Sequence, residues 1–155
     1  MGNWHSEWTW KFYAEQVARV RKLLERYVKE SDSSIDTDKY LAICEQLGET
    51  PDPERMPLDS SAFPEEVQVA FFIHSMLSDR WDGASGSYLG KDYSSIEYVL
   101  NLHEIHNPKV IFSFVKMYDT IIQAERFEKQ ERERKQRERK SKGSSGKNYT
   151  HNVKG

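Results

Sequence analysis

Apolar residues stop abruptly at Phe127, and this limits the part of the chain that can build a core. Beyond Phe127 the only apolar or aromatic side chains are Tyr149 and Val153. Charge changes sign at the same place. Residues 125–155 carry 11 Lys and Arg against 5 Glu, whereas residues 1–124 carry 12 Lys and Arg against 20 Asp and Glu. Because a segment without apolar residues cannot offset the entropy of ordering it into a core, we predict a helical domain over 1–125. Residues 126–155 are then a charged helical extension, reaching about residue 140, with a flexible tail.

The spacing of apolar residues before this point predicts an all-α fold. In residues 4–30 they recur three or four apart with no Gly or Pro between them, as on one face of a helix. A second, shorter helix is predicted to follow, with Asp36 or Thr37 as its N-cap and Gly48 at its end. We expect its buried face to consist of Tyr40, Ile43, Cys44 and Leu47.

Prolines and capping residues place the remaining helices. Three prolines predict an extended loop over 49–61, and Pro64 suits the first turn of a central helix that stops near residue 78. Asp92 is expected to cap a short helix, and Asn107-Pro108 begins the last one. No segment alternates strongly enough to predict a strand, although Ser87–Leu89 could form one. The chain is therefore predicted to be a small bundle of about five helices.

Composition excludes several classes of protein. The single cysteine, Cys44, rules out a disulfide framework and a zinc site built on cysteine pairs. No apolar run approaches the roughly 18 residues of a membrane-spanning helix, and no secretory leader is apparent. We expect a soluble protein of the cytoplasm that does not engage a membrane.

No catalytic or metal-binding motif is complete. The loop at 79–92 has too few residues between Gly86 and Gly90 for a P-loop, and Asp92 stands where a hydroxyl is needed. His103 and His106 are three apart, whereas a zinc-protease helix needs four. Asp79, Asp82 and Asp92 are close in sequence, but turn and cap chemistry explains them. Cys44 has the spacing of a core residue. We therefore expect neither an enzyme nor a cofactor or metal site.

Tryptophans are concentrated near the N-terminus. Trp4 and Trp8 share a face with Phe12, and they either pack into the core or contact another subunit or a partner. Trp81 and Tyr88 lie in the glycine-rich loop, where aromatic side chains often serve recognition. These four residues are the candidate partner-binding residues.

The basic tail raises the alternative of nucleic-acid binding. Its acidic residues, however, have the spacing of helical ion pairs, such as Glu125 with Lys129 and Glu128 with Arg132. A helix whose charges pair with one another is chiefly a solvated helix. The sequence therefore disfavours nucleic acid as the main partner.

A series of motifs runs through residues 63–125. It begins with a Pro-Glu-Glu-Val helix start at 64–67, an apolar helix ending at Met76-Leu77 and a Trp-Gly turn at 81–86. It continues with Gly-Lys-Asp-Tyr at 90–93, a short helix, a break at 105–108 and a final helix that turns into Lys, Arg and Glu. In this series the chain resembles the tail assembly chaperones of tailed bacteriophages. The lysine at 91 and the long Trp-rich first helix depart from the pattern.

This resemblance implies a binding function in the host cytoplasm. Such chaperones are not enzymes, and they coat the hydrophobic tape measure protein while the tail assembles. The resemblance thus implies the tape measure protein, or another phage tail protein, as partner. One alternative is a structural protein that stays in the virion, at the baseplate, neck or tail. The other is a nucleic-acid accessory protein that uses the basic tail.

Overall fold

The computed structural model describes residues 4–31 and 35–144, with side chains from residue 13 to residue 142 within those ranges. The predicted flexible tail beyond residue 144 lies outside the described residues. In chain order the elements are α1 (Trp4–Ser31), α2 (Thr37–Leu47), the 3₁₀ turn η1 (Ser60–Ala62), α3 (Glu65–Met76), β1 (Asp79–Trp81), β2 (Tyr88–Lys91), α4 (Ile96–Leu102) and α5 (Pro108–Ser144). The predicted bundle of about five helices is confirmed for the described residues, and a two-stranded hairpin is added to it.

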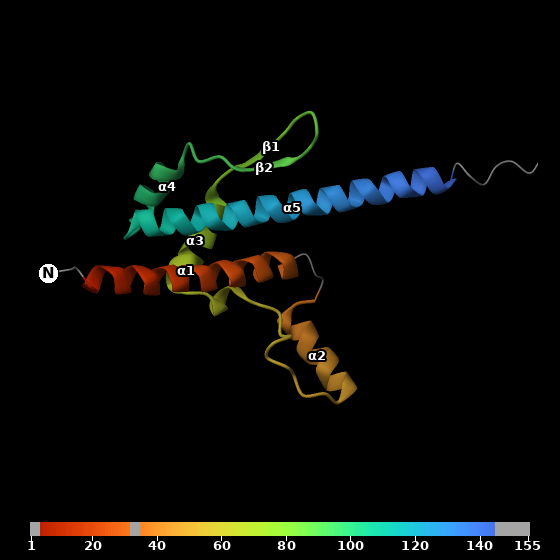
Figure 1. The fold of residues 1–155 in the computed structure, drawn as a ribbon, viewed down its shortest axis with the longest axis horizontal. Coiled ribbons are helices and arrows are strands. Elements are labelled where there is room, and N and C mark those ends of the chain that lie inside the picture. The colour runs from red at the N-terminus through yellow and green to blue at the C-terminus, as the bar shows by residue number, and fades with distance from the viewer. Residues whose placement is uncertain (1–3, 32–34, 145–155) are drawn as a thin grey trace, which may run out of the picture.

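The core lies where α1, α3 and α5 meet. Figure 1 shows α1 and α5 running side by side in the same direction, and α3 packs against α5 and α4. The apolar stripes of these helices supply the buried side chains, as their spacing predicts. The core consists of Val20, Leu24, Val28, Phe63, Val67, Ala70, Ile73, Leu77, Val99, Leu100, Ile111, Phe114, Val115 and Ile121. Tyr27 and Phe71 stack beside it, with ring centroids 5.4 Å apart.

Helix α2 begins and ends as predicted but is not buried as predicted. The Asp36 carboxylate accepts the N–H of Lys39 at 2.8 Å, and Gly48 ends the helix in the left-handed region at φ 67°. Of the four residues expected to form its buried face, only Cys44 is buried, whereas Ile43 and Leu47 are exposed. The reason is that α2 projects away from the bundle, so most of its apolar face has no helix to pack against (Figure 1).

The two later helix starts differ in their outcome. Asn107-Pro108 does begin α5. Asp92 does not cap α4, because its carboxylate accepts the N–H of Ser94 in a local turn and α4 begins only at Ile96. The predicted domain boundary at residue 125 falls inside α5, whose distal part continues as one helix beyond the bundle (Figure 1). No described helix has an apolar stretch sufficient to cross a bilayer.

Candidate functional site

The glycine-rich segment forms an antiparallel hairpin. Asp79 pairs with Lys91, Arg80 with Gly90 and Trp81 with Tyr88, and the register shifts between Arg80 and Trp81. The possible strand at 87–89 overlaps β2 (Tyr88–Lys91) at residues 88 and 89. The first half of the hairpin, 79–81, was not predicted as a strand, because three residues are too few to show an alternating pattern.

Asp82 holds the turn of the hairpin. Its carboxylate accepts the N–H groups of Ala84 at 3.3 Å and Ser85 at 3.1 Å, and also the Ser85 hydroxyl. These hydrogen bonds keep the pKa of Asp82 below its ordinary value. The Asp82 N–H donates to the Ser87 carbonyl at 2.8 Å, which closes the turn. The glycine-rich loop is therefore a braced turn, and the interpretation of Asp82 as a turn residue is confirmed.

Asp119 on α5 fixes the hairpin to the bundle. The side chain is 1% exposed, and its carboxylate has hydrogen-bond partners on α3, on β2, in the segment between β2 and α4, and on α5 itself. Oδ2 accepts the Tyr93 hydroxyl at 2.6 Å, the Gln123 side-chain amide at 3.0 Å and the Lys91 N–H at 3.2 Å. Oδ1 lies 3.3 Å from the Tyr88 hydroxyl and 3.4 Å from His74 Nε2 on α3. We call Asp119 and these five partners the Asp119 cluster.

The ionisation of the Asp119 cluster follows from these contacts. Burial favours a raised pKa for Asp119, but hydrogen bonds from Tyr93, the Lys91 N–H and His74 outweigh it and hold the pKa below 3.8. Burial lowers the pKa of His74, so a neutral imidazole faces a carboxylate. Burial and the Asp119 charge raise the pKa of Tyr88 and of Tyr93, so both phenols remain hydrogen-bond donors. Neutral hydrogen-bond donors thus stabilise the single negative charge of Asp119.

Gly90 lets the hairpin approach this charge. Its φ is +90°, a conformation that L side chains rarely adopt. A Cβ at this position would lie 2.3 Å from Gln123 Nε2 and 2.8 Å from Asp119 Oδ2. Glycine is therefore required here both for the backbone conformation and for the space.

The Lys91 side chain makes two further contacts at the base of the hairpin. Its Nζ donates to the Leu77 carbonyl at 2.9 Å and lies 2.8 Å from Asp79 Oδ1. The hydrogen bond and charge of Lys91 lower the pKa of Asp79. The three clustered aspartates of the sequence are thus all engaged in local structure: Asp79 in this ion pair, Asp82 in the turn and Asp92 in the turn before α4. They do not converge on one pocket.

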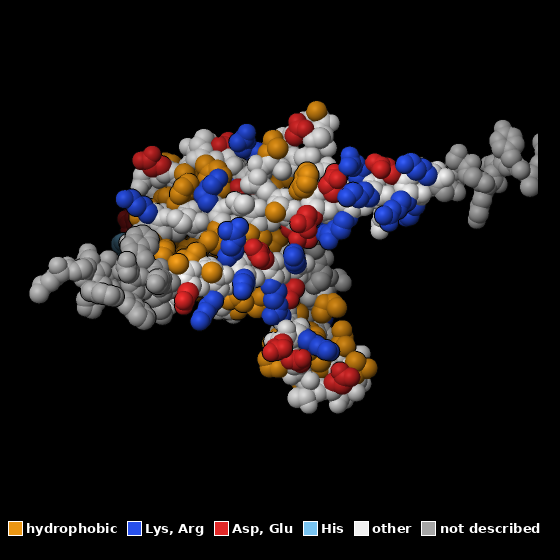
Figure 2. All heavy atoms as spheres, in the orientation of Figure 1, with side chains coloured by type: hydrophobic (Ala, Val, Ile, Leu, Met, Phe, Trp, Pro, Cys, Tyr) orange, Lys and Arg blue, Asp and Glu red, His pale blue; other side chains and the backbone are white. Residues whose placement is uncertain are grey.

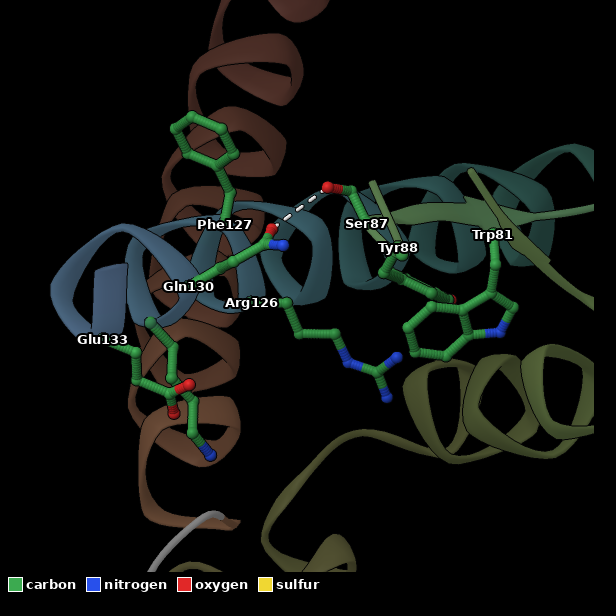
Figure 3. Close-up of a pocket in the computed structure, with 9 residues that line it drawn as sticks. Trp81, Ser87, Tyr88, Arg126, Phe127, Gln130 and Glu133 are labelled. Carbon is green, nitrogen blue, oxygen red and sulfur yellow. Dashed lines mark hydrogen bonds between the residues drawn. The ribbon is translucent and has the colours of Figure 1, made fainter. Parts of the chain in front are cut away.

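A groove opens between the hairpin and α5. Its lining residues are Trp81, Gly86, Ser87, Tyr88, Arg126, Phe127, Lys129, Gln130 and Glu133, and its volume is ≈ 250 Å³. We call it the hairpin groove. Figure 3 shows the Arg126 side chain extending from α5 toward the rings of Trp81 and Tyr88. Arg126 Cζ lies 4.1 Å from the centre of the Tyr88 ring and 5.5 Å from that of Trp81, and the Ser87 hydroxyl donates to Gln130 at 3.1 Å.

The hairpin groove presents aromatic surface to solvent. The side chain of Trp81 is 55% exposed and that of Phe127 is 64% exposed. Trp81 packs edge-to-face on Tyr88 at 5.2 Å, so its ring is held in place while much of it stays accessible. Large aromatic side chains that are both ordered and exposed are typical of contact surfaces.

Of the four candidate residues, the structure brings Trp81 and Tyr88 together. Trp4 and Trp8 belong to α1, but their side chains lie outside the described residues. Sequence reasoning missed Asp119, Arg126 and Phe127, all on α5. A signal for Asp119 was available, because it stands among the apolar residues of a stripe that faces the core.

His74 and His103 are engaged in contacts with neighbouring side chains. His103 packs edge-to-face on Phe72 at 5.0 Å, and His74 belongs to the Asp119 cluster. Within the part of the chain that the structure describes, no group of three or more His, Cys, Asp or Glu side chains is placed to hold a metal ion. No protein-family model, curated protein or solved structure matches the chain.

Proposed function

We propose that this chain is a non-catalytic phage tail assembly chaperone, whose hairpin groove holds an apolar segment of the tape measure protein. The observation that carries the proposal is the pair of exposed aromatic side chains, Trp81 and Phe127, on either side of the hairpin groove. The sequence resemblance over 63–125 supplies the identity of the client. The location of the proposed site supports it, because the Trp-Gly turn of that resemblance forms one wall of the groove.

The size and lining of the hairpin groove favour a protein client. Small-molecule pockets are usually about 300–1,000 Å³ and enclose most of their ligand. The hairpin groove, at ≈ 250 Å³, is smaller and has an exposed rim. It suits apolar side chains that project from a partner helix, with Arg126 and Gln130 available to polar groups beside them. Tryptophan and arginine are also the residue types most often found at the energetic centre of protein interfaces.

Rigid attachment of the hairpin strengthens the proposal. An interface that is ordered before binding loses less conformational entropy on association. The Lys91 N–H and the Tyr88 hydroxyl hold β2 on Asp119 of α5, and Lys91 Nζ donates to the Leu77 carbonyl at the end of α3. A client would therefore meet Trp81 in the position in which it binds.

The test is co-expression with the tape measure protein of the same genome, followed by pull-down and measurement of the soluble client. The wild-type chain should co-purify with the client and keep it soluble. Trp81→Ala should weaken the complex by about 2 kcal/mol or more, roughly 30-fold in Kd, as for the central residue of an interface. Tyr98→Ala is the matched control, because Tyr98 is an aromatic side chain of α4 that is 69% exposed and lies outside the hairpin groove. Failure of the wild-type chain to solubilise the client would refute the proposal.

A structural role in the virion gives a different result. An assembly chaperone should be absent from purified phage particles by mass spectrometry, whereas a baseplate, neck or tail protein should be present in them. Stoichiometric presence of this chain in particles would replace the chaperone proposal with the structural alternative.

A further inference from the structure

The distal part of α5 carries charge and no apolar surface. From Glu128 to Ser144 no side chain is apolar or aromatic, and residues 132–142 are all exposed. Residues 134–142 hold six Lys and Arg against one Glu. Figure 2 shows these basic side chains gathered on the part of the helix that extends past the bundle.

The ion pairs of this helix leave part of its positive charge unneutralised. Arg132 pairs with Glu125 at 3.2 Å, and so the predicted pair of Arg132 with Glu128 is not formed. Arg134 pairs with Glu131 at 3.0 Å and lies 4.0 Å from Glu138. Arg137 lies 3.8 Å from Glu133. Pairing therefore engages the arginines at 132, 134 and 137.

Three cations beyond these pairs share one face of the helix. Lys135, Arg139 and Lys142 stand at positions i, i+4 and i+7, which lie above one another on an α-helix. None of the three makes an ion pair with a residue in the described part of the chain. We call them the cationic stripe. With a rise of 1.5 Å per residue it is about 10 Å long.

We propose that the cationic stripe binds the phosphate backbone of duplex DNA. Duplex DNA carries a dense row of phosphates along each strand, and each of the three cations of the stripe can contact one of them. An α-helix with its side chains is about 10–12 Å across, and the major groove is about 12 Å wide, so a helix that projects from its domain can lie in it. The site is separate from the hairpin groove and does not depend on the function proposed for that groove.

The absence of apolar side chains from 128–144 favours DNA over a protein as partner. Protein interfaces depend on a buried apolar or aromatic centre, and this helix offers none beyond Phe127. Backbone binding of DNA needs only cations that release condensed counterions. An anionic membrane would also attract the charge, but this helix has no apolar face to insert.

The proposal is tested with the full chain and a fluorescein-labelled duplex of 30 base pairs and mixed sequence, by fluorescence anisotropy at 50–200 mM salt. Three phosphate contacts predict a slope of log K against log salt of about −2.7, which is roughly a 40-fold loss of affinity over this range. A triple variant of the cationic stripe should lose most of its affinity for the duplex and most of the salt dependence of that affinity. It carries Lys135→Gln, Arg139→Gln and Lys142→Gln. Far-UV circular dichroism confirms that each variant remains helical.

The control variant carries Arg19→Gln, Lys22→Gln and Lys29→Gln, three exposed cations of α1. It lowers the net charge by the same amount and should bind the duplex like the wild type. Equal losses in the two variants would overturn the proposal, since net charge alone would then explain binding. Binding of the wild type to vesicles of phosphatidylserine but not to the duplex would overturn it as well. Trp81→Ala should leave duplex binding unchanged, so this result is independent of the chaperone test.

Discussion

Substitution of three glycines of the hairpin by alanine measures how closely the hairpin must approach Asp119. Gly90 has φ +90° and would place a Cβ 2.8 Å from Asp119 Oδ2. Gly86 has φ +66°, but a Cβ there meets no atom within 4 Å. Gly83 also has open space, and its φ lies outside the left-handed region. The three positions therefore separate backbone strain from the steric effect at the Asp119 cluster.

The expected losses of stability differ by position. Gly83→Ala should change the free energy of unfolding by less than about 1 kcal/mol, and in the stabilising direction, because alanine restricts the unfolded chain. Gly86→Ala should cost about 1–2 kcal/mol for a side chain in the left-handed region. Gly90→Ala carries at least this strain, since its φ of +90° lies further from the conformations that L residues adopt. It also displaces a buried carboxylate oxygen that accepts three hydrogen bonds, which adds about 1–3 kcal/mol.

Urea unfolding followed by far-UV circular dichroism gives the three free energies, and thermal unfolding provides a second measure. A difference of about 1–3 kcal/mol between Gly90→Ala and Gly86→Ala corresponds to roughly 2–12 °C in Tm for a chain of this size. Equal stability of these two variants would refute the reasoning, because it would mean that the Cβ at residue 90 displaces nothing of consequence.

Three further predictions concern the contacts around the hairpin and the exposure of α2. The pKa of Asp119 is lower in the folded state than in the unfolded chain, so the Asp119 carboxylate contributes stability above pH 3.8 and loses this contribution as the pH falls through its folded pKa. The urea concentration at the midpoint of unfolding should therefore fall more steeply below pH 4 for the wild type than for Asp119→Asn. Lys91→Met should cost about 1–2 kcal/mol in thermal unfolding, because the Leu77 carbonyl loses its side-chain donor, and a loss under about 0.5 kcal/mol would contradict this. Leu47→Ala should stay within about 0.5 kcal/mol of wild type, whereas Leu24→Ala should cost about 2–5 kcal/mol, since the two residues are 65% and 0% exposed.

The helix boundaries were predictable because the interactions that set them are local. Asp36 accepts an N–H three residues later, and Gly48 takes a conformation that glycine adopts without strain. The stripes of α1 and α5 likewise follow from residues three and four apart. Asp92 shows the limit of this reasoning, because an aspartate can serve a turn as readily as a helix cap, and here it serves the turn before α4.

Features that depend on distant parts of the chain were not predictable. The amphipathic pattern of α2 does not reveal whether another element covers its apolar face, and Ile43 and Leu47 are exposed because none does. Asp119 meets His74 from 45 residues away and Lys91 from 28 residues away. Its position in an apolar stripe is visible in the sequence, but its partners are not.

The geometry of the hairpin links the buried charge to the exposed surface. A buried carboxylate without donors would cost several kcal/mol, so the donors of the Asp119 cluster must stay in place for the fold to be stable. Two of these donors, Tyr88 and the Lys91 N–H, belong to β2, and Tyr88 also supports the ring of Trp81. The Asp119 cluster therefore holds Tyr88 through its hydroxyl, and the Tyr88 ring in turn gives the Trp81 ring a surface to pack against. In this way a buried charge supports an aromatic side chain that is itself more than half exposed.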